Sequence, residues 1–143
     1  MKHWILLTLR IGLGGIFIWA GLTKLMGDPQ AFADGIESFR LFPNWMVNGL
    51  AIVAPMLELA AGILLLTRWG RLGALLGLVL ASVFTGLFAW ALIFGIQPNC
   101  SCFGAGSFSD FSPVLGLGRA AILWLLSGWL YLKLRVSQPA GTP

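Results

Sequence analysis

The stretch "MVNGLAIVAPMLELAAGILLLT", residues 46–67, is apolar along almost its whole length and carries one carboxylate, Glu58. A helix that crosses the hydrocarbon core of a bilayer needs about 20 predominantly apolar residues. This stretch therefore predicts a membrane span. Three further stretches of similar length and character lie at about 3–26, 71–96 and 117–134 and predict three more spans.

The composition agrees with a membrane protein. Hydrophobic residues make up 58% of the chain and charged residues only 10%, whereas a soluble domain carries about 25% charged residues. Nineteen glycines and seven tryptophans suit helices that pack closely in lipid and are anchored at its interfaces. We predict an all-α fold, an integral membrane four-helix bundle that forms a single domain over residues 1–143 with a flexible tail at 136–143.

The positions of lysine and arginine predict the orientation, because cytoplasmic loops of membrane proteins are enriched in both. One side of the predicted bundle carries Lys2, Arg68, Arg71, Lys133 and Arg135. The other side carries Lys24, Arg40 and Arg119, which are balanced by Asp28, Asp34, Glu37 and Asp110. We expect both termini in the cytoplasm of a bacterium, the protein in the inner membrane, and the loops at 27–45 and 97–116 in the periplasm. The net charge of +4 then reflects orientation in the bilayer and not nucleic-acid binding.

The first outer loop predicts a short amphipathic helix. Asp28 is suited to the N-cap, Pro29 to the first helical position, and Pro43 ends the run. Apolar residues recur between them at helical spacing, namely Ala31, Phe32, Ile36, Phe39 and Leu41. Such a helix would lie on the outer membrane surface, either as a lid over the bundle or as a docking surface for a partner.

Glu58 needs a partner, since a lone carboxylate inside a membrane is energetically expensive. At about 1.5 Å per residue, Glu58 lies roughly 13 Å and Arg10 roughly 9 Å from the inner ends of their spans. Lys24 lies about 15 Å further outward than Glu58 on the same measure. The depths therefore predict an intramembrane pair of Arg10 with Glu58. Three interpretations stay open: a structural ion pair, a site for a proton or a quinone headgroup, and an unpaired, protonated Glu58.

Cys100 and Cys102 are the only cysteines, and Ser101 alone separates them. A disulfide between them would close a very small ring, and strained disulfides are more easily reduced. So short a loop also constrains the unfolded chain little. Thiol–disulfide exchange is the leading interpretation, with Arg119 as the nearest cation in sequence that could favour a thiolate. A static disulfide, metal binding and inert thiols are the alternatives.

Metal chemistry has limited support. A structural zinc site needs four Cys or His ligands, and the chain has two cysteines and one histidine. We therefore assign no metal site. Copper(I) accepts thiolate and thioether ligands, and Met26 and Met46 are predicted near the outer face, so copper(I) handling at the cysteine pair stays an alternative.

Four segments together resemble the DoxX-like membrane proteins, and in particular their MauE branch, named for methylamine utilisation. They are "RIGLGGIFIWAGLTKL" (10–25), "FADGIESFRLFP" (32–43), "APMLELAAGILLL" (54–66) and "CSCFG" (100–104). The resemblance covers roughly residues 4–134 and implies a four-helix membrane bundle. Cys100 and Cys102 match the family's cysteine pair, with Ser101 where many relatives are expected to have glycine. Arg10, Lys24 and Glu58 match its recurring charged positions.

The resemblance also implies a function. The MauE branch is thought to assist maturation of the disulfide-rich small subunit of methylamine dehydrogenase, which implies a thioredoxin-like or other cysteine-containing periplasmic partner. The wider group includes subunits associated with quinol oxidation, so a quinone is the one cofactor that the resemblance suggests. The leading hypothesis is a membrane thiol–disulfide oxidoreductase. The alternatives are a non-catalytic assembly subunit and copper(I) handling; a transport path through so small a bundle would require a homo-oligomer.

Overall fold

The computed structural model describes residues 2–96 and 113–137. These residues form five helices: α1 (Lys2–Met26), α2 (Pro29–Ser38), α3 (Asn44–Leu66), α4 (Gly70–Ile93) and α5 (Pro113–Ser137). No strand occurs within this part of the chain. All but α2 are long and apolar enough to cross a membrane, as judged by length and composition. The prediction of an all-α membrane bundle is confirmed.

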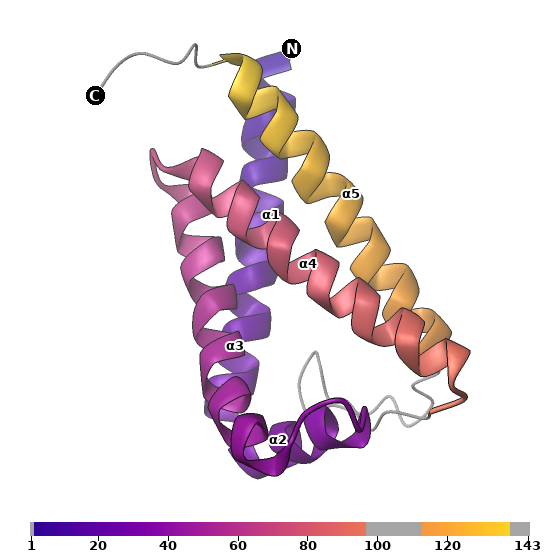
Figure 1. Cartoon of the computed structure of the whole chain (residues 1–143). Coiled ribbons are helices and arrows are strands. Elements are labelled where there is room, and N and C mark those ends of the chain that lie inside the picture. The colour runs from indigo at the N-terminus through magenta and orange to yellow at the C-terminus, as the bar shows by residue number, and fades with distance from the viewer. Residues whose placement is uncertain (1, 97–112, 138–143) are drawn as a thin grey trace.

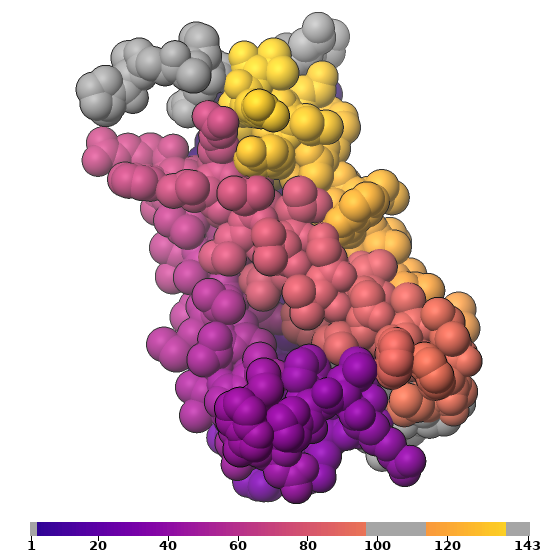
Figure 2. Space-filling view, viewed as in Figure 1, coloured from indigo at the N-terminus to yellow at the C-terminus, as the bar shows by residue number. Residues whose placement is uncertain are grey.

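The long helices form two pairs, α1 with α3 and α4 with α5 (Figure 1). The pairs lie close together at the end of the molecule where α1 begins, α5 ends and the α3–α4 turn lies. They diverge toward the opposite end, and α2 lies across that end between α3 and α4 (Figures 1 and 2). We call the first end the terminal end and the second the α2 end. Among the described residues, the terminal end is basic, and the α2 end carries Asp28, Asp34 and Glu37 together with Arg40.

Small residues permit close contacts within the α1–α3 pair and between the two pairs. A Cβ at Gly62 of α3 would lie 2.8 Å from the Gly14 carbonyl oxygen of α1. A Cβ at Gly73 of α4 would lie 2.5 Å from the Leu65 amide nitrogen of α3. Neither contact leaves room for a side chain, so the backbones approach closely, as in other membrane helix pairs.

The outward faces of the long helices are apolar. Large side chains in the middle of the helices are exposed, among them Ile11, Ile52, Val79, Val83 and Leu125. An apolar exterior of this kind is suited to lipid and not to water. The structure therefore agrees with a multi-pass membrane protein.

The predicted amphipathic helix in the first outer loop is present as α2. The Asp28 carboxylate accepts a hydrogen bond of 3.0 Å from the Gln30 amide, and Pro29 is the first helical residue, which are the expected N-terminal signals. The apolar side of α2 is buried: Phe32 and Phe39 join a cluster with Phe88 of α4 and Ala120 of α5. This helix is therefore packed against the bundle through its apolar face.

Several helix boundaries differ from the prediction, and at the end of α4 the reason is local. α4 ends at Ile93, three residues before the predicted end, because Gly95 adopts a left-handed φ of 64°. The Ile96 amide then donates to the Ala91 carbonyl at 2.9 Å, the bond that closes a glycine-terminated helix. α5 begins at Pro113, four residues before the predicted start, and runs through Ser137 into the predicted tail. The rest of that tail lies outside the described residues.

Candidate functional site

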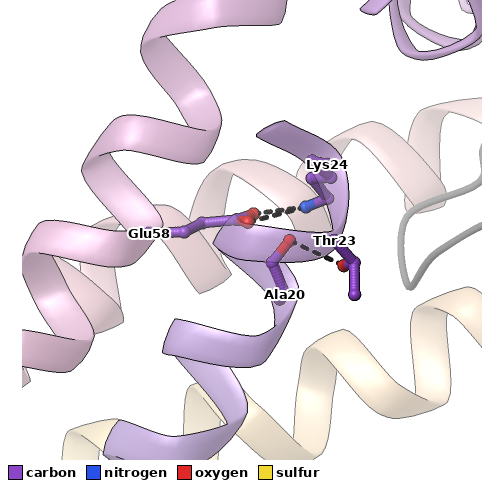
Figure 3. A network of polar contacts seen from close by, with 4 residues as sticks. All are labelled: Ala20, Thr23, Lys24 and Glu58. Atoms are coloured by element: carbon purple, nitrogen blue, oxygen red, sulfur yellow. Dashed lines mark hydrogen bonds and ion pairs between the residues drawn. The ribbon is translucent and has the colours of Figure 1, made fainter. Parts of the chain in front are cut away.

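Lys24 and Glu58 form a buried ion pair between α1 and α3 (Figure 3). The Lys24 ammonium donates to both carboxylate oxygens, at 2.6 Å to Oε1 and 2.8 Å to Oε2. The side chains are only 3% and 4% exposed. Because each charge would be very unfavourable alone inside a membrane, the two-fold hydrogen bonding is what allows both to be buried here.

The predicted pair of Arg10 with Glu58 is wrong, and the helix register explains why. The prediction assumed that the inner ends of the two spans are level. In the structure Gly21 of α1 packs on Pro55 and Leu59 of α3. Lys24 lies about one turn further along α1, which brings its flexible side chain within reach of Glu58.

Arg10 has a different role, at the end of α3. Its guanidinium donates to the carbonyl oxygens of Leu65 at 3.0 Å and Thr67 at 2.5 Å. A cation at the C-terminus of a helix satisfies carbonyls that have no partner within the helix and interacts favourably with the helix dipole. The same guanidinium lies beside Gly70, where a Cβ would be 2.6 Å from Nη2. Arg10 thus links α1 to the end of α3 and the start of α4.

Two aromatic rings face the Lys24 ammonium from other elements. Nζ lies 5.2 Å from the ring centroid of Phe32 on α2 and 5.0 Å from that of Phe84 on α4. Both distances are within the range of favourable cation–π interactions. The ion pair is therefore enclosed by four helices, α1, α2, α3 and α4. The sequence predicted α2 as a lid but did not link it to the ion pair.

A cavity lies next to the ion pair, between the two helix pairs. It leaves about 40 Å³ of space open to a molecule the size of water. Its lining comes from α1, α3, α4 and α5, and comprises Ile16, Phe17, Ala20, Lys24, Glu58, Ala81, Phe84, Phe88, Gly116, Ala120 and Leu123. Apart from Lys24 and Glu58, every one of these residues is apolar. The ion pair thus borders a small, almost wholly apolar space.

A second, wider groove opens at the surface between α1 and α5. Arg119, the other polar residue singled out in the sequence, lines this groove and not the cavity. The groove also contains Gly12, Gly15 and Trp19 of α1. Ile16 and Leu123 line both the groove and the cavity, so the two spaces meet at the contact between α1 and α5.

The predicted cysteine site, Cys100 and Cys102, lies outside the described residues. The residues on either side of that segment are described: Ile96 and Leu117 pack into the apolar cluster that contains Phe32 and Phe39. The segment is thus joined to the bundle at the α2 end. Within residues 2–96 and 113–137, no group of three or more His, Cys, Asp or Glu could hold a metal ion.

The fold and the ion pair define a class, a multi-pass membrane bundle with paired charges buried between its helices. Residues 2–133 match the family described as "MauE: Methylamine utilisation protein MauE", and the chain belongs to this family. The MauE branch of the sequence resemblance is thereby confirmed, whereas the wider DoxX-like relationship stays a prediction.

Curated relatives agree with the family assignment. The chain is 30% identical over 141 residues to "Methylamine utilization protein MauE" of Paracoccus denitrificans, covering 97% of this chain and 73% of the relative. It is 31% identical over 147 residues to the protein of the same name from Paracoccus versutus, covering 98% and 74%. No solved structure matches the chain significantly.

Proposed function

We propose that this protein is an inner-membrane component of a methylamine-utilisation-type system that exchanges disulfides with a periplasmic protein and so assists its maturation. The observation that carries the proposal is the pair Cys100 and Cys102, separated by one residue, in a chain that belongs to the MauE family. The relatives' printed names support the methylamine link. The tight cysteine spacing supports the exchange chemistry.

In the proposed exchange, a thiolate of the partner attacks one sulfur of a Cys100–Cys102 disulfide. A mixed disulfide forms, and the second cysteine of this chain leaves as a thiolate. A second thiolate of the partner then attacks the partner's sulfur in the mixed disulfide. The products are an oxidised partner and reduced Cys100 and Cys102, with two electrons moved between the proteins; the same steps in reverse reduce the partner. The net reaction is an exchange and needs no further oxidant.

The charge distribution supports a periplasmic position for the cysteines. Within the described residues, Arg68, Arg71, Lys133 and Arg135 lie on the terminal end, and the positive-inside rule assigns such an end to the cytoplasm. Ile96 and Leu117, which flank the cysteine segment, pack at the α2 end. On this orientation the thiols face an oxidising compartment, in which disulfides persist.

Trapping the thiols in cells tests the proposal. Cells expressing the wild type, Cys100→Ser or Cys102→Ser are quenched with acid and alkylated, and the adducts are separated by mass. The proposal expects a mixture of reduced and oxidised wild type. It also expects a mixed disulfide with a second protein that accumulates in one serine variant and disappears on reduction.

Results that contradict disulfide exchange would support one of the competing functions. Full methylamine-dependent growth of both serine variants would exclude thiol exchange and leave a non-catalytic assembly subunit. Purified protein that retains copper(I), and loses it in both serine variants, would favour copper handling instead. Ser101→Ala is the matched control, since it changes the same segment and leaves both thiols in place.

A further inference from the structure

We propose that the groove between α1 and α5 binds one phospholipid from the leaflet at the α2 end, with the anionic phosphate of its headgroup on Arg119 and an acyl chain along Gly12 and Gly15. The site is separate from the ion pair and from Cys100 and Cys102. It can therefore stand or fall independently of the proposed exchange.

The groove has room for an acyl chain. It leaves about 560 Å³ of space open to a molecule the size of water, whereas the cavity beside the ion pair leaves only about 40 Å³. Its α1 wall runs from Ile11 to Trp19, which is about 12 Å at 1.5 Å per residue. The hydrocarbon core of a bilayer is about 30 Å thick, so the groove is about as long as the acyl region of one leaflet.

The walls of the groove are apolar, and part of its α1 side is bare backbone. Ile11, Ile16 and Ile122 line it and are exposed. Gly12 and Gly15 lie on α1 in the same lining, and a Cβ at either position would meet no described atom within 4 Å. Glycine is unfavourable inside a helix, and at these two positions the described helices do not fill the space that it leaves. A flexible chain of CH₂ groups fits such a hollow.

Arg119 gives the groove its charge. Among the described residues that line the groove, it is the only charged one, and it is exposed. The apolar span of α5 begins at Val114, so Arg119 lies about 7–8 Å along the helix from that end. An arginine at this depth can extend its guanidinium to the headgroups while its methylene groups stay among the acyl chains. Guanidinium binds phosphate through two parallel hydrogen bonds.

Trp19 marks the same end of the groove from the other wall. It is the residue of the α1 wall nearest the α2 end, it is 67% exposed, and tryptophan is enriched at the level of lipid headgroups. A guanidinium has five N–H donors, so binding a phosphate does not require Arg119 to give up contacts within the chain. The end with Trp19 and Arg119 therefore suits an anionic headgroup.

A phospholipid fits this surface better than a second copy of the chain. In a two-fold dimer the same surface meets itself, which would bring two Arg119 guanidiniums to one interface, where like charges repel. An anionic phosphate is attracted to Arg119 instead. Because α1 and α5 belong to different helix pairs, which diverge toward the α2 end (Figure 1), the bound lipid would also link the two pairs.

Native mass spectrometry of the full chain tests the headgroup. The purified protein in detergent is titrated with dioleoylphosphatidylglycerol, which is anionic, or with dioleoylphosphatidylcholine, which has the same acyl chains and no net charge. We expect one phosphatidylglycerol per chain to bind roughly tenfold more tightly than phosphatidylcholine, as expected for hydrogen bonds from a charged donor. Glycerol phosphate, which lacks acyl chains, should not displace it at the same concentration.

Variants of two arginines show whether Arg119 is responsible. Arg119→Gln should abolish the preference for phosphatidylglycerol, and Arg119→Lys should retain part of it, since lysine keeps the charge but not the paired donors. Arg40→Gln is the control, because Arg40 is exposed at the α2 end and does not line the groove. Equal binding of the two lipids by the wild type, a preference undiminished in Arg119→Gln, or displacement by glycerol phosphate would overturn the proposal.

Filling the groove tests the place of the acyl chain. Gly15→Leu puts a side chain into the groove, whereas Gly86→Leu puts one on the outer face of α4, where a Cβ also meets nothing within 4 Å. We expect both lipids to bind several-fold more weakly to Gly15→Leu and unchanged to Gly86→Leu, with melting temperatures showing that both variants are folded. Equal lipid binding by the two variants would overturn the proposal. If Gly15→Leu also converted a dimer into a monomer, the groove would be a docking surface for a second copy instead.

Photolabelling distinguishes a bound lipid from the lipid that surrounds any membrane protein. Phosphatidylglycerol with a diazirine at the end of one acyl chain is incorporated into nanodiscs with the full chain, irradiated, and the labelled residues are mapped. We expect labels to concentrate on Ile11 and Ile16 and to fall several-fold in Gly15→Leu. Labelling as strong at Ile52 and Val79, which are exposed on α3 and α4, would contradict a specific site.

Discussion

At the scale of single residues, the most consequential contact is the one between Lys24 and Glu58. Each side chain is almost fully buried, and each has the other as its charged partner. Removing one partner of such a pair leaves a buried charge without compensation, whereas replacing both partners by apolar residues leaves no buried charge. The two kinds of substitution should therefore have very different effects on stability.

We expect Glu58→Leu to lower the free energy of unfolding by about 3 kcal/mol or more. The double variant Lys24→Met/Glu58→Leu should unfold close to the wild type, since no buried charge remains. Thermal unfolding of the protein in detergent, followed by near-UV circular dichroism, measures both. Glu37→Leu, at an exposed position on α2, serves as the control. A single variant as stable as the double variant would show that the ion pair does not stabilise the fold.

The sequence identified Lys24, Arg10 and Glu58 as the important charges but paired them wrongly. Depth along a span can be counted from the sequence only if the ends of neighbouring helices are assumed to be level. The register of α1 on α3 is instead set by close contacts such as Gly21 on Pro55 and Leu59. The spacing of glycines such as Gly14, Gly21 and Gly62 indicates which faces meet, but the register depends on how the two helices fit together.

At the scale of elements, the contact between α1 and α3 supports the candidate site. It places Lys24 beside Glu58, and it relies on the absence of side chains at Gly14, Gly21 and Gly62. α2 completes the enclosure by bringing Phe32 over the ammonium. The position of the charges is thus a property of helix packing and not of any one helix.

Gly62→Val should disrupt this packing. The new Cβ would lie 2.7 Å from Cγ1 of Ile18 and 2.8 Å from the Gly14 carbonyl oxygen, so the helices must separate. We expect a loss of about 2–3 kcal/mol of stability, as for other overpacked contacts, and weaker binding of Lys24 to Glu58. Gly49→Val in the same helix is the control, because a Cβ there meets nothing within 4 Å. Equal melting temperatures for the two variants would contradict the close contact.

The helices could be predicted from the sequence more reliably than the contacts between them. Runs of apolar residues identified all four long helices, and Asp28 with Pro29 marked the start of α2. The errors lay at ends such as that of α4, where Gly95 stops the helix before the apolar run ends. Hydrophobicity measures suitability for lipid, whereas the end of a helix depends on local backbone geometry.

At the scale of the whole molecule, charge is divided between the two ends. Within the described residues, the terminal end carries arginine and lysine without an acidic residue, whereas the α2 end carries Arg40 together with Asp28, Asp34 and Glu37. This asymmetry favours one orientation in the membrane. The same asymmetry is visible in the sequence, because Arg68, Arg71, Lys133 and Arg135 lie close to the ends of apolar runs.

We expect a fluorescent protein fused after the last residue to fluoresce in bacterial cells, and alkaline phosphatase fused at the same point to be inactive. The first folds in the cytoplasm and the second only in the periplasm. Replacing Arg68 and Arg71 together by glutamate should weaken this preference and give a mixture of orientations. Arg40→Glu, at the α2 end, should not. Active phosphatase in the fusion to the unaltered chain would show that the C-terminus lies in the periplasm. The cysteines would then lie on the cytoplasmic side.

The link between Lys24 and Glu58 has a consequence for biosynthesis. Both residues precede α4 and α5 in the chain, so the ribosome has delivered both before the second helix pair exists. α1 and α3 can therefore neutralise their charges as a hairpin-like unit during insertion, without waiting for the remaining helices. Arg10 is likewise already present when the α3–α4 turn emerges and can dock the turn as it forms. The two charges can thus pair before α4 completes their enclosure.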